Sequence, residues 1–390
     1  MAEAYIVSAA RTAGGRRGGR LSRWHPADLA GSVLDSIMDR TGIDPALVED
    51  VIMGCVGQAG EQSTNIARGA VLSSRLPESV PGVSVDRQCG SSQQALHFAA
   101  ATVMSGMMDV VIAGGVESMS RVPMGLSSDF LAGQGHGDYK SPRQNLRYPD
   151  TLFSQFTGAE MIAEKHGLSK DELDEFGFVS QTKAIEATRS GLFEKEIVPV
   201  PITLADGSEA MHAVDEGIRF DISREGVAGV RLIREGGRLT AATASQICDG
   251  ASGVLVANER GLRSLGLTPL ARIHSMTVSG GDPVIMLEEP LAATDKALKR
   301  AGMTIGDIDL YEVNEAFASV PLAWLRHTGA DPDNLNVNGG AIALGHPLGS
   351  SGTKLMTTLL HALQQRGKRW GLQTMCEGGG LANVTIVERL

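Results

Sequence analysis

One short stretch indicates how this chain folds: Asp109-Val110-Val111-Ile112-Ala113-Gly114-Gly115. The successive apolar residues Val110 to Ala113 are typical of a strand that is buried on both faces. A second stretch of this kind lies about 260 residues later, Gly371-Leu372-Gln373-Thr374-Met375-Cys376, and it also runs into glycines. The pair indicates that the chain contains two similar parts.

Two further pairs of segments follow the same order at about the same offset. In each part, short apolar runs alternate with helical patterns, which is typical of strands connected through helices. The sequence therefore predicts an α/β fold with two duplicated halves, residues 1–260 and 267–390. Residues from about 121 to 245 have no counterpart in the second half. We expect them to form an inserted loop domain over the core, where substrate-binding loops are usual, with simple surface decoration as the alternative. The matched segments are Gly42-Ile43-Asp44 before Val51–Cys55 with Gly302-Met303-Thr304 before Tyr311–Glu315, and Gly90-Ser91-Ser92 with Gly349-Ser350-Ser351.

The composition excludes several classes of function. A formal charge of −10 over 390 residues argues against a nucleic-acid or anionic-membrane partner, since either requires a basic surface. No window is long and apolar enough to be inserted into a membrane, and the first residues do not resemble a signal peptide. One basic stretch near the N-terminus is interpreted as a solvated loop or an interface, with a site for a phosphate-bearing ligand as the alternative. Its residues are Arg11, Arg16, Arg17, Arg20 and Arg23.

The cysteines are few and widely spaced. None lies in a Cys-x-x-Cys pair or in a Cys/His cluster at zinc spacing, so we expect no metal site. So few thiols in so long a chain also argue against a disulfide framework, which favours a reducing compartment and a cytoplasmic enzyme. The four are Cys55, Cys89, Cys248 and Cys376.

Cys89 is the first candidate for a chemical role. It lies in Asp86-Arg87-Gln88-Cys89-Gly90-Ser91-Ser92, between a strand-like run and a helical pattern. Backbone N–H groups at a helix N-terminus stabilise a thiolate, and a strand-to-helix turn exposes the sulfur. The pattern favours a nucleophile, although an inert packed cysteine is the more common finding for an isolated Cys.

Three other segments supply matching chemistry. His346 lies between Gly345 and Pro347, and because proline restricts the preceding residue, the imidazole is expected in a rigid extended loop as a base for Cys89. Cys376 precedes Gly378 and two neighbouring glycines, where N–H groups can converge on an oxyanion. Asn314 follows an apolar run and can hold a water or donate toward an enolate oxygen.

Together these motifs resemble the thiolase family, and the resemblance covers essentially the whole chain. It implies a thiolase fold, with two α/β halves stacked as a five-layer αβαβα sandwich. It also implies an acyltransferase that uses CoA and acetyl-CoA as substrates, binds no permanent cofactor, and forms a homo-oligomer, either a dimer or a tetramer. The motifs that carry the resemblance are Ala10-Arg11-Thr12, the Cys89 segment, Gly114–Ser120, Asn314–Ala318, Gly345–Gly352 and Cys376–Gly380.

The resemblance implies a role for each site residue. Cys89 carries the acyl group, His346 activates it, and Cys376 moves the proton at the substrate α-carbon. A water on Asn314 forms one oxyanion hole with His346, and the N–H groups of Cys89 and Gly378 form the other. Two residues are expected to contact CoA: Ser245 at the pantetheine arm and, by a looser match, Arg231 at the nucleotide end.

The same resemblance implies thiolytic cleavage of 3-ketoacyl-CoA to acetyl-CoA and a shortened acyl-CoA, as in lipid degradation. Phe156-Thr157-Gly158 favours this direction, because short-chain biosynthetic members show His-Met-Gly there. Formation of acetoacetyl-CoA from two acetyl-CoA is the alternative, and a non-catalytic lipid carrier is a weaker one. Cys376 argues against a decarboxylating ketoacyl synthase. Two smaller departures are Glu377, expected to point away from the site, and Ser92, expected to be tolerated where glycine is usual.

Overall fold

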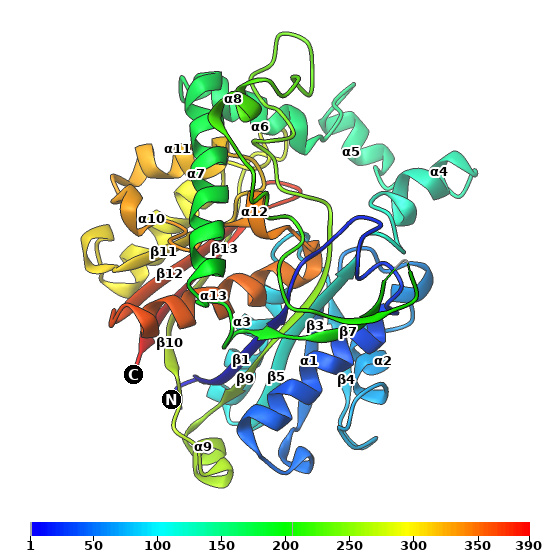
Figure 1. Ribbon diagram of the computed structural model, residues 1–390, viewed down its shortest axis with the longest axis vertical. Coiled ribbons are helices and arrows are strands. Elements are labelled where there is room, and N and C mark those ends of the chain that lie inside the picture. The colour runs from blue at the N-terminus through cyan, green and yellow to red at the C-terminus, as the bar shows by residue number, and fades with distance from the viewer. Residues whose placement is uncertain (1, 205) are drawn as a thin grey trace.

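The computed structural model describes residues 2–204 and 206–390, and its largest feature is an 11-stranded mixed sheet built in two halves (Figure 1). The first half contains β1 (Tyr5–Thr12), β2 (Gly15–Arg16), β3 (Asp50–Gly54), β4 (Gly82–Val85), β5 (Val110–Ser118) and β9 (Cys248–Ala257). The second half contains β10 (Ala271–Gly280), β11 (Leu310–Val313), β12 (Trp370–Glu377) and β13 (Leu381–Arg389). The strand order is β1-β9-β5-β3-β4 in the first half and β10-β13-β12-β11 in the second.

The strand pairings confirm the predicted duplication. β3 and β5 are parallel, as are β11 and β12, and the antiparallel pairs β5–β9 and β9–β1 match β12–β13 and β13–β10. The parallel β3–β4 pair has a reduced counterpart, a single bridge between Tyr311 and Leu335. A short antiparallel contact of Tyr5 with Arg272 joins the two halves into one sheet. The halves are thus two copies of one strand arrangement.

Helices form three layers around the two half-sheets. The central helices are α3 (Ser91–Ser105) and α13 (Ser351–Gln365); α1 (Pro26–Thr41) and α2 (Ile66–Leu72) cover the first half, and α10 (Pro290–Ala301) and α11 (Ser319–Thr328) cover the second. Leu96 of α3 and Leu359 of α13 belong to one apolar cluster that also contains Val111 and Val387, one strand residue from each half. Burial of these side chains against both half-sheets stabilises the stack. The five-layer sandwich is therefore confirmed.

The two central helices meet at their N-termini. A Cβ atom on Gly352 would lie 2.2 Å from the backbone nitrogen of Gln93, so only glycine allows this approach. The Ser92 hydroxyl accepts a hydrogen bond from the Thr353 N–H at 3.0 Å. The serine at position 92, which was expected only to be tolerated, therefore makes a contact between the two central helices. This contact places the loops before α3 and before α13 side by side, and both carry candidate site residues.

The segment between β5 and β9 packs over the core. Its strand β6 pairs in parallel with β1, and α6 and α7 pack against the second half. The elements of the segment are the π-turn Leu126–Phe130, α4 (Leu131–Gly133), α5 (Pro142–Arg147), α6 (Gln155–Lys165), α7 (Lys170–Arg189), β6 (Ile197–Val198), the hairpin β7 (Val200–Thr203) and β8 (Glu209–His212), and α8 (Arg224–Ala228). Elsewhere lie α9 (Glu259–Leu265), α12 (Ala341–Leu344) and the 3₁₀ turns Pro45–Leu47, Gly60–Gln62, Ile305–Asp307, Pro332–Asn334 and Leu348–Ser350.

The basic stretch near the N-terminus does not act as one unit: Arg16, Arg17, Arg20 and Arg23 are exposed, as expected for a solvated loop, whereas Arg11 is buried, which corrects the interpretation for that residue. Arg11 is 0% exposed and donates to Glu196 at 2.6 Å and to both carboxylate oxygens of Asp215 at 2.8 and 3.0 Å. Both partners come from the inserted segment, so this buried cluster joins the insertion to β1. Removal of one partner from such a cluster costs about 3–5 kcal/mol because a buried charge is left uncompensated.

Candidate active site

Cys89 lies at a strained turn between β4 and α3. The preceding Gln88 has φ +49°, a left-handed conformation that a side chain rarely adopts. The turn places the sulfur beside the start of α3 at 8% exposure, next to the N–H of Gly378. A group that reaches this sulfur therefore also meets backbone donors.

Burial decides the protonation of Cys89. Burial, and to a smaller extent the nearby Glu377 carboxyl, raise the pKa of the thiol to about 12 against the hydrogen bonds from the Gly378 N–H and from its own N–H, which lower it. The expected stabilisation of thiolate by the helix N-terminus is present but smaller than the cost of burial. Cys89 is thus a thiol at neutral pH, and formation of its thiolate requires a base.

Cys376 is the second thiol of the site and lies at the end of β12. Burial raises its pKa well above the usual value, the neighbouring Cys89 raises it further, and a hydrogen bond from the Asn314 amide lowers it. The turn after β12 contains Gly379 and Gly380 at φ +84° and +75°, which glycine adopts without strain. The strand from the second half and the turn from the first thus bring both thiols together.

His346 completes the group. Its Nδ1 lies 2.5 Å from the Ser351 hydroxyl, which donates its own hydrogen to the Pro347 carbonyl at 2.9 Å. Nδ1 is therefore the protonated nitrogen, and Nε2, 3.5 Å from the Asn314 amide nitrogen, carries the free lone pair. Burial lowers the pKa of His346 to about 3, with a smaller contribution from Lys354, so the imidazole is neutral and can accept a proton.

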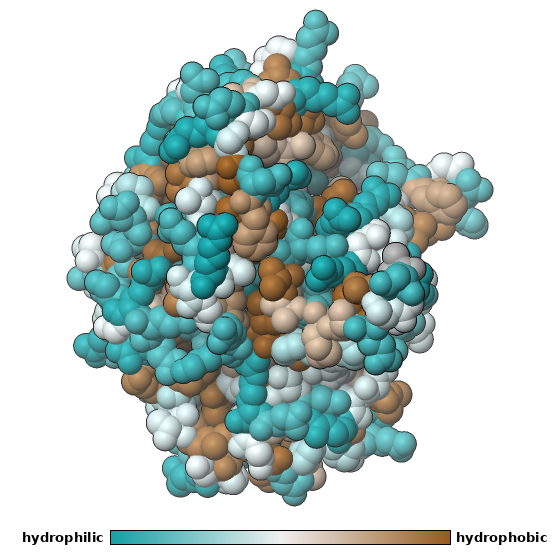
Figure 2. Space-filling model, viewed as in Figure 1, coloured by the Kyte–Doolittle hydropathy of each residue, from teal (hydrophilic) through white to brown (hydrophobic). Residues whose placement is uncertain are grey.

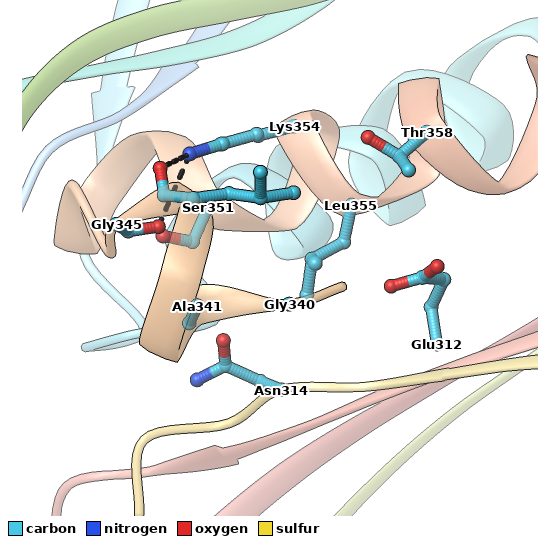
Figure 3. A pocket seen from close by; sticks show the side chains of 10 residues that line it. Glu312, Asn314, Gly340, Ala341, Gly345, Ser351, Lys354, Leu355 and Thr358 are labelled. Carbon is cyan, nitrogen blue, oxygen red and sulfur yellow. Dashed lines mark hydrogen bonds between the residues drawn. The ribbon is translucent and has the colours of Figure 1, made fainter. Parts of the chain in front are cut away.

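Buried polar side chains hold the His346 loop. Glu117 accepts hydrogen bonds from the N–H groups of Gly349 and Val56, both at 2.9 Å, which ties the loop to the end of β3. Figure 3 shows Lys354 reaching back from α13 to the Gly345 carbonyl, at 3.1 Å. The same view shows Glu312, Ser351 and Asn314 around a small cavity, which has about enough room for one water. Glu117, Ser351 and Lys354 were missed by sequence reasoning, although Glu117 and Ser351 lie in quoted motifs.

Two surface hollows lie near the residues expected to contact CoA. A hollow of about 420 Å³ is lined by Ala242 and Gln246, which flank Ser245, and a second of about 500 Å³ lies next to it. Ser245 is half-buried, with its N–H bonded to the Ala316 carbonyl at 2.9 Å. Arg231 is exposed and follows Val230 on the rim of the first hollow.

Arg219 lines both hollows and was not singled out from the sequence. The available signal was only its positive charge, which it shares with Arg224, Arg231, Arg234 and Arg238 in the same segment. Arg16 lines the second hollow, so the alternative interpretation of the basic stretch, a site for a phosphate-bearing ligand, stays a prediction for Arg16, while the buried Arg11 does not fit it.

The inserted segment also exposes apolar side chains. Figure 2 shows apolar residues on the projection that carries α4, where Phe130 and Leu131 are 56% and 40% exposed. Nearer the core, Phe156 is 43% exposed and packs edge-on against Phe317, with ring centroids 5.5 Å apart. Phe317 belongs to the segment that follows Asn314, so this aromatic pair lies near the site. Among the described residues, no helix is long and apolar enough to cross a membrane.

Comparison with known proteins identifies the family. Residues 4–260 match the model of the thiolase N-terminal domain, and residues 267–389 match that of the thiolase C-terminal domain. The steroid 3-ketoacyl-CoA thiolase FadA6 of Mycobacterium tuberculosis is 52% identical over 100% of this chain and 95% of its own length. The 3-ketoacyl-CoA thiolase of Yersinia pestis is 42% identical over the full length of both proteins. The crystal structure of the Bacillus anthracis acetyl-CoA acetyltransferase superposes with a TM-score of 0.91 at 34% identity, over 100% of this chain and 99% of the other. With the duplicated halves and the paired thiols already described, these matches confirm the resemblance: the chain belongs to the thiolase family of acyltransferases.

Proposed function

We propose that this chain cleaves a 3-ketoacyl-CoA with free CoA, forming acetyl-CoA and an acyl-CoA shortened by two carbons. One observation carries the proposal: Cys89 from the first half lies close enough to Cys376 from the second to raise its pKa, and the Asn314 amide contacts both Cys376 and His346. A nucleophile, a neutral base and a second acid are the groups that this reaction requires. The names of the 52% and 42% identical relatives support the same reaction.

The first step forms the acyl-enzyme. The Cys89 sulfur attacks the 3-keto carbon while its proton passes to His346 Nε2, the nitrogen with the free lone pair. The bond between the α-carbon and the 3-keto carbon then breaks, and its electron pair leaves on the acetyl-CoA enolate. Cys376 donates its proton to the enolate α-carbon and becomes a thiolate. The raised pKa of Cys376 suits this role, because such a weak acid stays protonated at neutral pH and gives up its proton only to a strong base such as the enolate carbon.

The second step regenerates the enzyme. The Cys376 thiolate takes the thiol proton of CoA, and the CoA sulfur attacks the thioester carbonyl on Cys89. Cys89 leaves as a thiolate and recovers its proton from the His346 imidazolium. Both thiols and the imidazole thus return to their starting protonation, and no other reactant is needed.

Two sets of donors face the oxygens that become negative. The N–H groups of Cys89 and Gly378 already donate to the Cys89 sulfur, which places them beside the carbon that the sulfur attacks. A water on Asn314, together with His346, serves the enolate oxygen. Loss of one such donor typically costs about 3 kcal/mol of transition-state stabilisation, or about 10²-fold in rate.

Coenzyme A is assigned to the two hollows. Ser245 contacts the pantetheine arm, and Arg219 and Arg231 lie at the nucleotide end, where their charges meet phosphate oxygens. The assignment of the nucleotide end depends more on Arg219 than on Arg231, because Arg219 lines both hollows. No resident cofactor takes part.

The assembly and the location are part of the same proposal. The edge strand β4, which precedes Cys89, is half-exposed with Val83 at 43%, and a second copy of this chain pairing there accounts for the exposed edge. A homo-oligomer, as a dimer or a tetramer, is expected in light scattering. Four free, buried cysteines fit a reducing compartment such as the cytoplasm.

A thiolysis assay across 3-ketoacyl-CoAs of increasing length and ring content tests the function. Activity on acyl groups longer than acetoacetyl, or bearing rings as the name of the 52% identical relative suggests, supports the degradative reaction. Activity confined to acetoacetyl-CoA favours the alternative, synthesis of acetoacetyl-CoA from two acetyl-CoA, which the 34% identical acetyl-CoA acetyltransferase supports by its fold. Absence of turnover with acyl-CoA binding retained would indicate the lipid-carrier alternative.

A further inference from the structure

Glu377 is a buried acid beside the two thiols that the proposed reaction does not use. It follows Cys376 in β12, and because neighbouring strand residues point to opposite faces, its side chain is directed toward α3 while Cys376 faces the outer layer of the second half. A Cβ atom on Gly90 would lie 1.9 Å from the Glu377 Oε1 atom. The carboxyl group therefore packs against the backbone of Gly90, which is the N-cap of α3 and follows Cys89 directly in the sequence. The expectation that Glu377 points away from the site is wrong.

The environment of this carboxyl group is nearly dry. Glu377 is 0% exposed, and within residues 2–204 and 206–390 neither carboxyl oxygen has a hydrogen-bond partner at normal geometry. Burial raises its pKa to about 9, and Arg87 and the Asn383 N–H oppose that rise without reversing it. A carboxylate without partners at such a site is costly, so the group is a neutral acid at pH 7.

Few charged or titratable groups face Glu377. From the turn before α3 they are Cys89 and the half-buried Arg87, and from its own strand Cys376. His97 of α3 lies farther along the same polar layer, where burial lowers its pKa to about 3 and leaves it neutral. Arg87 is the one cation among these groups and leaves the carboxyl pKa raised. An ionised Glu377 would therefore act mainly on the two thiols.

We propose that Glu377 is a positioning residue for acyl transfer. As the neutral acid it does not compete with the Cys89 sulfur for the positive N-terminal end of α3, and its ionisation opposes formation of the Cys89 thiolate. The proposal rests on the assignment of Cys89 as the nucleophile. When Glu377 ionises, its proton passes to solvent and a second negative charge appears beside the same helix N-terminus. Two negative charges there repel each other, so carboxylate with thiol, or carboxylic acid with thiolate, are the favoured pairs. In turnover the Cys89 proton goes to His346, and Glu377 stays protonated throughout.

The test compares three proteins: wild type, Glu377→Gln and Asp206→Asn. Glutamine has the shape of the neutral acid and cannot ionise, and Asp206 is an acid in the exposed turn between β7 and β8. The rate of Cys89 alkylation by iodoacetamide is measured from about pH 6 to about pH 10, with the labelled peptide identified by mass spectrometry. The variant-to-wild-type ratio for Glu377→Gln is expected near one at pH 6, rising to about tenfold above pH 9, while Asp206→Asn stays near one.

A ratio that does not change with pH, at any value, would overturn the proposal, because a merely structural role has no reason to follow the ionisation of residue 377. A parallel incubation with labelled acetyl-CoA tests the assignment of Cys89 as nucleophile separately from the role of Glu377. If the acetyl group is not found on Cys89, the assigned nucleophile is wrong. If it is found there and the alkylation ratio is flat, only the role of Glu377 fails.

A measurement on wild-type protein replaces the variant if Glu377→Gln does not fold. Infrared spectra of protein carrying ¹³C-labelled glutamate show the band of a protonated carboxyl group. Other buried glutamates such as Glu312 contribute to this band, so the Glu377 component is the part expected at pH 7 and lost over the alkaline range in which the Cys89 alkylation rate deviates from a single titration. A spectrum without a protonated glutamate at pH 7 would overturn the proposal.

Discussion

The Ser351 hydroxyl bonds to the imidazole of His346, the proposed base, and its removal gives a quantitative prediction. Ser351 accepts the Nδ1 hydrogen of His346 at 2.5 Å, and the imidazole is 4% exposed, so water cannot readily replace the lost oxygen. In Ser351→Ala, the buried Nδ1–H loses its partner or the ring changes tautomer and turns a protonated nitrogen toward Cys89. An unsatisfied buried donor costs about 1–3 kcal/mol, which is about 5- to 150-fold in rate if the cost appears in the transition state.

The assay is steady-state thiolysis, with the loss expected in kcat rather than in KM because Ser351 touches the imidazole and not the substrate. Ser350→Ala is the matched control. That hydroxyl is equally buried in the same turn, but it bonds to Ser252 at 2.8 Å and not to the imidazole. If Ser351→Ala keeps the wild-type kcat, or loses no more than Ser350→Ala, the tautomer argument is refuted.

The other predictions concern the two thiols and their neighbours. Cys89→Ala is expected to abolish thiolysis and acetyl labelling, since the covalent path is lost; substantial residual turnover would contradict its assignment. Asn314→Ala is expected to lower kcat by about 10²-fold, measured in the same assay, and an unchanged kcat would remove Asn314 from the oxyanion site. Unfolded Glu377 ionises near pH 4.5 and folded Glu377 near pH 9, so between these values the folded state binds one more proton and stability falls as pH rises. Glu377→Gln should therefore gain stability relative to wild type with pH, by about 3 kcal/mol at pH 7, in denaturation curves from about pH 5 to about pH 8; a pH-independent difference would contradict this. Gly90→Ala should destabilise the fold because its Cβ meets Glu377 at 1.9 Å, and Glu377→Ala should restore part of the loss.

Much of the site could be predicted because its residues lie at the ends of regular elements. Cys89 precedes a helix with a clear apolar period, and Asn314 and Cys376 end buried strands, so local pattern locates each one. The duplication then indicates that the two sets of strand ends face each other. The expected direction of Glu377 was wrong because it depends on a residue of the other half, the glycine at position 90, which leaves room for a carboxyl group on the inner face.

The sequence by itself determined the α/β class and the two halves, since apolar period, glycine placement and repeated spacing are properties of the chain read in order, and the resemblance of its motifs singled out the candidate reacting residues. Only the tertiary structure decided which groups are charged. Burial, and contacts between residues more than 100 positions apart, make Cys89 a thiol and His346 a neutral base, and they enclose Arg11 between two acids of the insertion. The free energy of a charge depends on the solvent and partners around it, and those are fixed only when the two central helices bring distant loops together.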